Sequence, residues 1–208
     1  MYVLQEELAI KILKKIGVES FLSSEELDIA RYNLTIIIIN IEKMFIVYGM
    51  AFVANTITVT LCMHIAFSSL RRYAGGWHAT TSRGCSLISI FIFVIVPKLA
   101  LEIVKTSYAF NSLFYYSVIW LLLLSILQFA PADTEKNPVV GFKLRKSRQI
   151  KAIIVFCSLI TVSFFLPSSY QFAIFLGVLL ECLTIHPLYY AMFKRSYNNY
   201  EKYEAHDE

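Results

Sequence analysis

A short polar segment between two apolar stretches brings together the residue types that acyl transfer requires. It runs from Arg71 to Cys85 and reads RRYAGGWHATTSRGC. A cysteine is nucleophilic as its thiolate, which positive surroundings or a helix N-terminus stabilise. Cys85 has both prospects, because Gly84 precedes it at the expected start of an apolar helix and Arg83 lies nearby in the sequence. We therefore interpret Cys85 as a candidate nucleophile.

His78, seven residues before Cys85, is the candidate base. On one unbroken helix the two residues would share a face but lie about 10 Å apart along the axis, too far for a thiol–imidazole hydrogen bond. The dyad therefore requires a turn between them, which residues 80–84 favour. Gly75 and Gly76 supply a second flexible point, where a peptide substrate could approach the backbone. The residues alone leave open that His78 is an interfacial histidine and that the glycines only shape a loop.

The composition around this segment is typical of a membrane protein. Of the 208 residues, 57% are hydrophobic and 16% are charged, against about 25% charged in soluble domains. Long apolar runs separate the charged residues, and such helices need apolar surroundings on every side. The first 20 residues are too charged for the apolar part of a cleavable signal peptide. An ordinary soluble core is excluded.

The apolar runs predict an all-α, polytopic membrane protein with about six transmembrane helices, formed as a single integral membrane domain over residues 1–208. The runs lie near residues 34–54, 56–70, 86–104, 110–130, 152–167 and 172–193. Residues 1–33 precede them as an amphipathic segment. Its apolar side chains repeat at helical spacing at Leu4, Leu8, Ile12 and Ile16. This segment is expected to lie on the membrane surface or to pack on the protein itself.

The distribution of positive charge predicts the orientation. Basic residues gather before the first apolar run, within 71–83, in a basic loop at 131–151 and after the last run. The connections expected on the other side carry only Lys105. Because cytoplasmic segments are enriched in Lys and Arg, both termini, the 71–85 segment and the 131–151 loop are expected in the cytoplasm. Five spans would break this pattern, so six are favoured.

Other residues give weaker candidates. Cys182 and His186 stand one helical turn apart and form the rival Cys–His pair, but Pro187 follows them and no Gly or Arg cluster accompanies them. The cysteine spacing fits neither a zinc site nor a disulfide framework, and no metal or other cofactor is expected. Nucleic-acid binding is not expected either, because the net charge is only +4 and the aromatic residues lie inside apolar runs.

Glu42 and Lys43 support an alternative function. They interrupt the first apolar run, and charges inside a membrane usually face a bundle interior or water. A small multi-pass transporter or channel component with a polar pathway around these residues is the competing class, although no convincing internal repeat is present. A structural membrane scaffold is a third class, which would tolerate any change at Cys85.

The motifs of the 71–85 segment resemble those of the accessory gene regulator B family, bacterial membrane endopeptidases that process the precursor of a cyclic autoinducing peptide. The matching residues are Arg71, Arg72, Gly76, His78, Ala79 and Cys85. The resemblance continues at residues 129–134, which read FAPADT, and in the spacing of the apolar runs. Some members carry lysines directly after this motif. Here the basic cluster comes later, at 143–151, so no lysine role is transferred.

The resemblance implies a cysteine endopeptidase of the bacterial cell membrane. His78 would take the proton of Cys85, which attacks a precursor carbonyl, and the C-terminal part of the precursor leaves. A thiol or hydroxyl of the precursor then closes a thiolactone or lactone ring, giving a quorum-sensing peptide. Arg71, Arg72, Gly75 and Gly76 would support the site or bind substrate. The expected partners are the precursor peptide and the lipid bilayer, and a homodimer is a possible assembly. Asp133 is expected to be a solvated loop carboxylate rather than a partner of His78.

Overall fold

The computed structural model describes residues 3–77, 82–106, 112–135 and 138–204 of the chain. Their regular elements are helices, and Gly75 and Ala132 form an isolated parallel bridge. The expected all-α class is therefore confirmed. The chain forms two compact units, Met1–Met50 and Ala51–Glu208.

The first unit consists of α1 (Val3–Ile16), the short 3-10 helix η1 (Val18–Ser20) and most of α2 (Ser24–Val53). The helix expected in the N-terminal segment is thus present, and α2 begins well before the apolar run at residue 34. Ser23 and Glu26 explain this start. The Glu26 carboxylate accepts hydrogen bonds from the backbone nitrogen and the hydroxyl of Ser23, at 2.9 and 2.8 Å. The backbone nitrogen of Glu26 in turn donates to the hydroxyl oxygen of Ser23 at 3.4 Å, and this reciprocal arrangement is a capping box.

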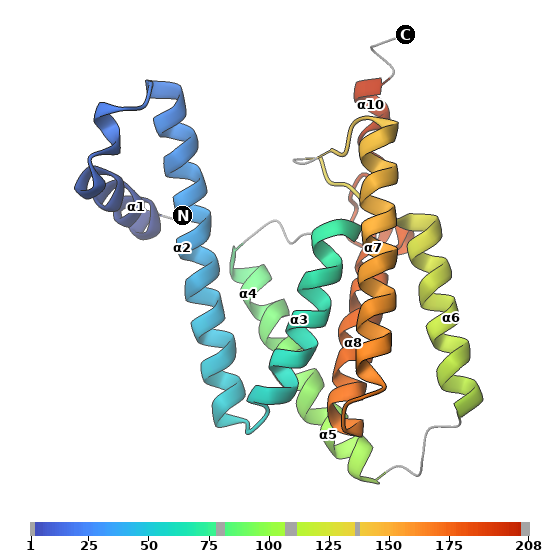
Figure 1. The fold of residues 1–208 in the computed structure, drawn as a ribbon. Coiled ribbons are helices and arrows are strands. Elements are labelled where there is room, and N and C mark those ends of the chain that lie inside the picture. Colours follow the sequence, from blue (N-terminus) through green and yellow to red (C-terminus); the bar gives the residue numbers. More distant parts are fainter. Residues whose placement is uncertain (1–2, 78–81, 107–111, 136–137, 205–208) are drawn as a thin grey trace. The chain divides into compact units, whose positions relative to one another are not determined.

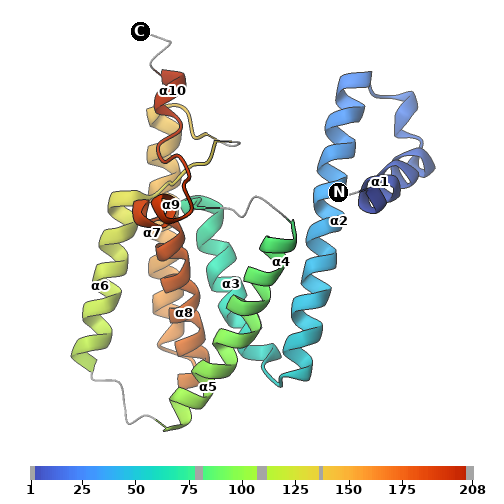
Figure 2. The ribbon, with the colours of Figure 1, turned by 180° about the vertical axis from the view of Figure 1, so that it is seen from behind.

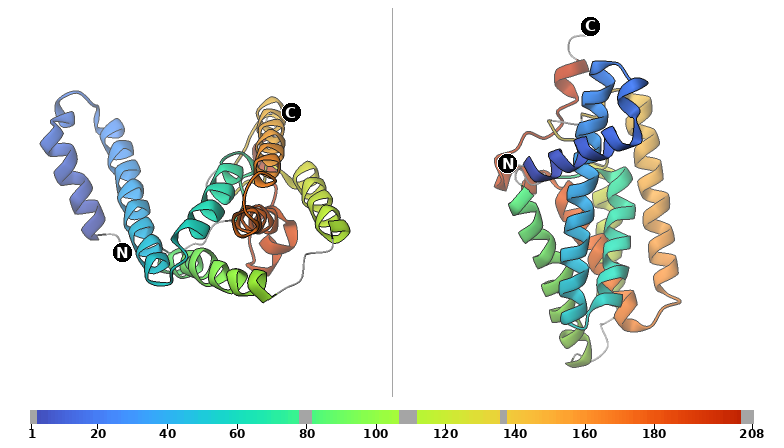
Figure 3. Two further views of the ribbon diagram at one scale, coloured as in Figure 1. Left: turned by 60° about the horizontal axis from the view of Figure 1, so that its bottom comes forward. Right: turned by 90° about the vertical axis from the view of Figure 1, so that its left-hand side faces the viewer.

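Polar contacts hold α1 against α2, which it crosses at an angle (Figure 3). Arg31 forms an ion pair with Glu6 at 2.8 Å. Gln5 donates a hydrogen bond to Glu42 at 2.9 Å, so the carboxylate on which the transporter alternative rested has a partner on α1. A polar pathway around Glu42 and Lys43 stays a prediction.

The second unit is a helical bundle around α8 (Figures 1 and 2). Its elements are α3 (Ile57–Ala74), α4 (Ser82–Ile90), the π-helical turn η2 (Phe91–Ile95), α5 (Val96–Thr106), α6 (Ser112–Phe129), α7 (Phe142–Ser163), α8 (Ser168–Ile185), α9 (Pro187–Met192) and α10 (Glu201–Glu204). Helices α3, α5, α6 and α7 all contact α8, and the left view of Figure 3 shows them arranged around it.

Helices α3 and α8 approach each other closely because Gly177 has no side chain. A Cβ atom at Gly177 would lie 2.5 Å from the carbonyl oxygen of Met63. Small residues permit such approach, and Ala66 of α3 is fully buried at the same contact. Val178 of α8 and Leu70 of α3 are also buried. This contact sets the spacing between the two helices that carry the candidate site.

The run from α4 to α5 is continuous and is widened at η2. The hydroxyl of Thr60 on α3 donates a hydrogen bond of 2.6 Å to the carbonyl of Phe93. A side chain that takes a carbonyl out of the helical ladder is a common cause of such a local π-turn. The bond also attaches the α4–α5 run to α3.

The expected apolar runs coincide with helices, but their number as membrane spans is not confirmed. In the described part of the chain, two helices are long and apolar enough to cross a bilayer, α2 and α8. Shorter apolar helices cover Ser86–Leu99 and Tyr115–Phe129. Six spans therefore stay a prediction. The basic residues expected in a loop up to residue 151 lie instead on α7, which begins at Phe142.

Candidate functional site

The arginine pair lies in the last turn of α3, and two glycines end the helix. Gly75 has φ 75° and Gly76 has φ 119°, conformations that side chains rarely adopt. A Cβ atom at Gly75 would lie 2.0 Å from the backbone oxygen of Ala132, and one at Gly76 would lie 2.7 Å from Oγ1 of Thr184. These glycines therefore face other parts of this chain, not open space.

Backbone hydrogen bonds attach the segment after α3 on two sides. On one side, Gly76 donates to the carbonyl of Ala132 at 3.0 Å, and Ala132 donates to that of Ala74 at 2.8 Å. On the other, Trp77 donates to the carbonyl of Thr184 near the end of α8, at 3.0 Å. The chain is thus held between the loop after α6 and the end of α8 up to the residue before His78.

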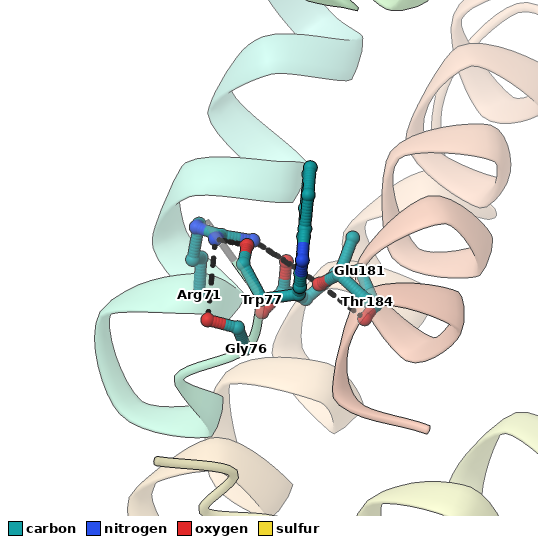
Figure 4. Close-up of polar contacts among 5 residues, drawn as sticks. All are labelled: Arg71, Gly76, Trp77, Glu181 and Thr184. Carbon is teal, nitrogen blue, oxygen red and sulfur yellow. Dashed lines mark hydrogen bonds and ion pairs between the residues drawn. The ribbon is translucent and has the colours of Figure 1, made fainter. Parts of the chain in front are cut away.

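Arg71 connects the same parts through its side chain (Figure 4). Its Nη1 atom lies 3.1 Å from Oε2 of Glu181 and 3.1 Å from Oγ1 of Thr184, both on α8. Its Nη2 atom donates to the carbonyl of Trp77 and, at 3.5 Å, to that of Gly76. A planar guanidinium suits such a bridge, because its donors point in fixed directions. Glu181 and Thr184 are functional candidates that the motif did not single out.

Trp77 is an anchor that sequence reasoning also missed. Its indole is buried and packs against Phe193, at a centroid distance of 4.5 Å, and edge-on against Tyr189 at 5.5 Å. Its Nε1 atom is buried without a hydrogen-bond partner among the described residues. A tryptophan directly before His78 was the available signal, since large aromatic side chains fix a segment by burial.

The two proposed catalytic groups are described only in part. His78 lies outside the described residues, as does the side chain of Cys85, so the dyad stays a prediction. The backbone of Cys85 lies in the first turn of α4, at the N-terminal end of the helix, where the helix dipole favours negative charge. Residues 82–84 are already helical, which corrects the turn expected at 80–84. Residues 80 and 81 of that expected turn lie outside the described residues.

Arg72 differs from its neighbour Arg71. Its side chain is exposed, and its guanidinium carbon lies 5.8 Å from the centroid of the Tyr73 ring. The Nζ atom of Lys151 on α7 lies 5.9 Å from the same centroid. Tyr73 thus links Arg72 to the basic cluster at the start of α7, whose cations are Lys143, Arg145, Lys146, Arg148 and Lys151.

Asp133 is buried, which corrects the expectation of a solvated loop carboxylate. It accepts hydrogen bonds from the backbone nitrogens of Asn199 and Tyr200, each at 2.8 Å. Its carbonyl accepts a hydrogen bond from the hydroxyl of Tyr190 at 2.8 Å. Asp133 therefore attaches the C-terminal segment, which includes Asn199 and Tyr200, to the loop after α6.

That segment borders a pocket of about 460 Å³ at the start of α7. The pocket is lined by Gln128, Phe129, Ala130, Pro131, Phe142, Arg145, Lys146, Gln149, Tyr197, Asn198 and Tyr200. Burial raises the pKa of Tyr197 to about 12, so its hydroxyl stays protonated and donates to the carbonyl of Phe129 at 3.2 Å. A hydrogen bond from Arg145 holds the pKa of Glu204 below its usual value.

Cys182 and His186, the rival Cys–His pair, lie on either side of the end of α8. Cys182 is buried, and its sulfur lies 3.7 Å from the carbonyl oxygen of Leu122. His186 follows the last residue of the helix in an extended conformation, and its Nδ1 atom accepts a hydrogen bond from the nitrogen of Leu188 at 3.2 Å. Each residue thus has its own partner, which does not favour a Cys182–His186 dyad. Among the described residues, no group of His, Cys, Asp and Glu could hold a metal ion.

Comparison with known proteins bears on this site. The family model described as "Accessory gene regulator B" matches residues 8–185. An AgrB-like protein of Listeria innocua is 38% identical over 175 residues, which cover 84% of this chain and 83% of the relative. The accessory gene regulator protein B of Staphylococcus intermedius is 34% identical over 184 residues, covering 88% and 93%. That of Staphylococcus epidermidis is 32% identical over 160 residues, covering 77% and 79%.

No solved structure matches the chain significantly. The family model covers the first long apolar helix, the arginine pair, both glycines and the whole of α8. Two apolar helices together with this match indicate membrane association. The chain belongs to the accessory gene regulator B family, whose members act in agr quorum sensing.

Proposed function

We propose that this protein is a multi-pass membrane cysteine endopeptidase that cleaves a precursor peptide through a thioester on Cys85. The observation that carries the proposal is the combination of two features. Cys85 stands in the first turn of α4, and the segment that ends directly before His78 is held on both sides by Ala132 and Thr184. A fixed segment of this kind preorganises a base, which is what nucleophilic catalysis requires.

The reaction proceeds as acyl transfer. His78 takes the proton of the Cys85 thiol, and the thiolate attacks the carbonyl carbon of the scissile peptide bond. Backbone N–H groups near Cys85 and Ser86 stabilise the oxyanion. His78 then returns the proton to the leaving amine, which departs with the C-terminal part of the precursor. The acyl group remains on Cys85 as a thioester.

Ring closure uses the energy retained in the thioester. A thiol or hydroxyl of the bound precursor gives its proton to His78 and attacks the thioester carbonyl. The Cys85 thiolate leaves, and a thiolactone or lactone ring forms. Water must be kept from the thioester during this step. The product is a cyclic quorum-sensing peptide.

The exposed cations provide the binding surface for the precursor. Arg72 and Lys151 both lie near the Tyr73 ring, at 5.8 and 5.9 Å from its centroid. The surface continues along the first turns of α7, beside the pocket that contains Arg145 and Lys146. A surface of this charge attracts an acidic peptide. We place this surface, the 71–85 segment and both termini in the cytoplasm, in keeping with the positive-inside rule.

The test compares the wild type with Cys85→Ala and His78→Ala in reconstituted vesicles that receive a synthetic precursor. The wild type should cleave the precursor and form an adduct that mass spectrometry detects and hydroxylamine removes. Cys85→Ala should bind the precursor without an adduct or cleavage, and His78→Ala should retain at most slow turnover from residual thiolate. Cleavage by Cys85→Ala together with inactive Cys182→Ala would move the site to α8.

A further inference from the structure

Glu181 is an acid that α8 buries completely, with a relative exposure of 0%. Its Oε2 atom accepts hydrogen bonds from Arg71 at 3.1 Å and from Thr184 at 3.0 Å. Its Oε1 atom has no partner among the described residues. Buried ion pairs seldom add net stability, and buried unpaired oxygens reduce it. A packing role alone therefore does not account for this carboxylate.

The guanidinium of Arg71 connects Glu181 to the residues directly before His78. One side of the group, Nη1, binds Glu181 and Thr184 on α8, and the other side, Nη2, binds the carbonyls of Gly76 and Trp77 (Figure 4). Because the group is planar and rigid, fixing one nitrogen fixes the direction of the other. The two carbonyls belong to the residues directly before His78.

We propose that Glu181 and Thr184 are positioning residues that, through Arg71, set the path of the chain into His78. This proposal rests on the proposed peptidase function. Neither residue needs to touch the precursor, since both act on the carbonyls of Gly76 and Trp77. Arg71 is then a link within the protein, and Arg72 is the arginine available to substrate.

The contact between α3 and α8 does not depend on this ion pair. Farther along the two helices, Gly177 meets the Met63 carbonyl, and Ala66 and Val178 are fully buried. The two helices should therefore stay packed when Glu181 or Thr184 is changed. A loss of activity with an intact fold is the expected signature.

The first experiment isolates the Thr184 hydroxyl in the full chain in vesicles. Thr184→Val keeps the volume and removes the hydroxyl, whereas Thr184→Ser keeps the hydroxyl. We expect Thr184→Val to lower kcat for precursor cleavage at least about ten-fold, because the hydroxyl's hydrogen bonds with Arg71 and Glu181 are both lost, with KM nearly unchanged. Thr184→Ser should restore most of the rate. Equal rates for the two variants would overturn the role of Thr184.

The second experiment asks whether Glu181 affects the Cys85–His78 pair. Alkylation of Cys85 by iodoacetamide is followed against pH by mass analysis of the Cys85 peptide. An activated thiol reacts at a lower pH than an isolated one. Glu181→Gln should shift the profile toward that of His78→Ala. The matched control is Cys182→Ala, a buried change on the same turn of α8, which should keep the wild-type profile.

The third experiment separates positioning from stability. Replacing both partners, Arg71→Met with Glu181→Leu, should preserve the melting temperature, because apolar replacements of buried ion pairs are tolerated. Cleavage should nevertheless be lost. A double variant with wild-type kcat would overturn the proposal.

The outcomes also distinguish this proposal from the function on which it rests. If Cys85→Ala still cleaves, the peptidase assignment fails and the positioning role falls with it. If Cys85→Ala is inactive while Glu181→Gln keeps the wild-type kcat and pH profile, only the positioning role fails. If Glu181→Gln does not fold, the comparison of Thr184→Val with Thr184→Ser tests the positioning role by itself.

Discussion

The carboxylate of Asp133 accepts two hydrogen bonds from Asn199, one from its backbone nitrogen at 2.8 Å and one from its side-chain amide at 3.3 Å. The two residues lie 66 positions apart in the chain. Through this contact the loop after α6 is joined to the C-terminal segment. The same loop accepts a hydrogen bond from the nitrogen of Gly76 at the carbonyl of Ala132. The loop after α6 therefore holds both the segment before His78 and the C-terminal segment.

Asp133→Ala should release this C-terminal segment. The change leaves the buried N–H group of Asn199 and the partly buried N–H group of Tyr200 without their acceptor, at a cost of about 1–3 kcal/mol each. Limited proteolysis should therefore cut between residues 195 and 204 much faster than in the wild type. Glu135→Ala, at an exposed position of the same loop, is the control. Equal cleavage of the two variants would show that Asp133 does not hold the segment.

Gly75→Ala should be far more damaging than Gly141→Ala. Both glycines have positive φ, 75° and 95°. A Cβ atom at Gly75 meets the Ala132 oxygen at 2.0 Å, whereas one at Gly141 meets nothing within 4 Å. Backbone strain accounts for about 1–3 kcal/mol in both, and the clash should add about 1–3 kcal/mol at Gly75 alone. Thermal unfolding in detergent measures the difference, and similar losses would contradict it.

Attachment of α10 should depend on pH through Glu204. Hydrogen bonds from Arg145 and from the backbone of Gly141 hold the pKa of this carboxyl below its usual value of 4.5. A lowered pKa means that the stabilising contribution is fully present above pH 4.5 and is lost as the pH falls through the folded value. Protease sensitivity of the C-terminal segment should rise over that range. Glu204→Gln should be sensitive at every pH, and a retained pH dependence in that variant would refute the assignment.

Reversing Arg72 and Lys151 to Glu should raise KM for the precursor several-fold and leave kcat nearly unchanged. The reason is that exposed charges steer an acidic peptide without entering the reaction. Added salt should weaken wild-type binding in the same way. Lys202→Glu, an exposed reversal on α10, is the control. A precursor whose acidic residues are changed to Lys should rescue the double variant, and absence of rescue would count against charge recognition.

A reporter fused at Val140 should be active only if the reporter functions in the cytoplasm. The expectation follows from the basic residues at 143–151, directly after this position. Fusions after the last residue should behave alike. Activity of an extracytoplasmic reporter at Val140 would contradict the six-span orientation.

The amino-acid sequence by itself determined the helical class, the approximate position of the apolar helices and of the amphipathic α1, and the segment in which chemistry was expected. These features are local. Apolar runs predict helices through hydropathy, and Arg71, Gly76 and Cys85 are recognisable by type and spacing. The helix starts at Ser24, Ser82 and Phe142 were missed or displaced, because hydropathy finds the apolar part of a helix and not the polar turns before it.

The tertiary structure alone decided which residues meet. Arg71 and Glu181 lie 110 positions apart, and nothing in the local pattern distinguishes a buried acid that pairs with an arginine from one that faces water. The same is true of Gly75 with Ala132, whose carbonyl oxygen leaves no room for a side chain at position 75. It is also true of Asp133 with Asn199. Such pairs depend on how α3, α6 and α8 pack, and packing follows from the fit of whole helix surfaces, which periodicity does not encode.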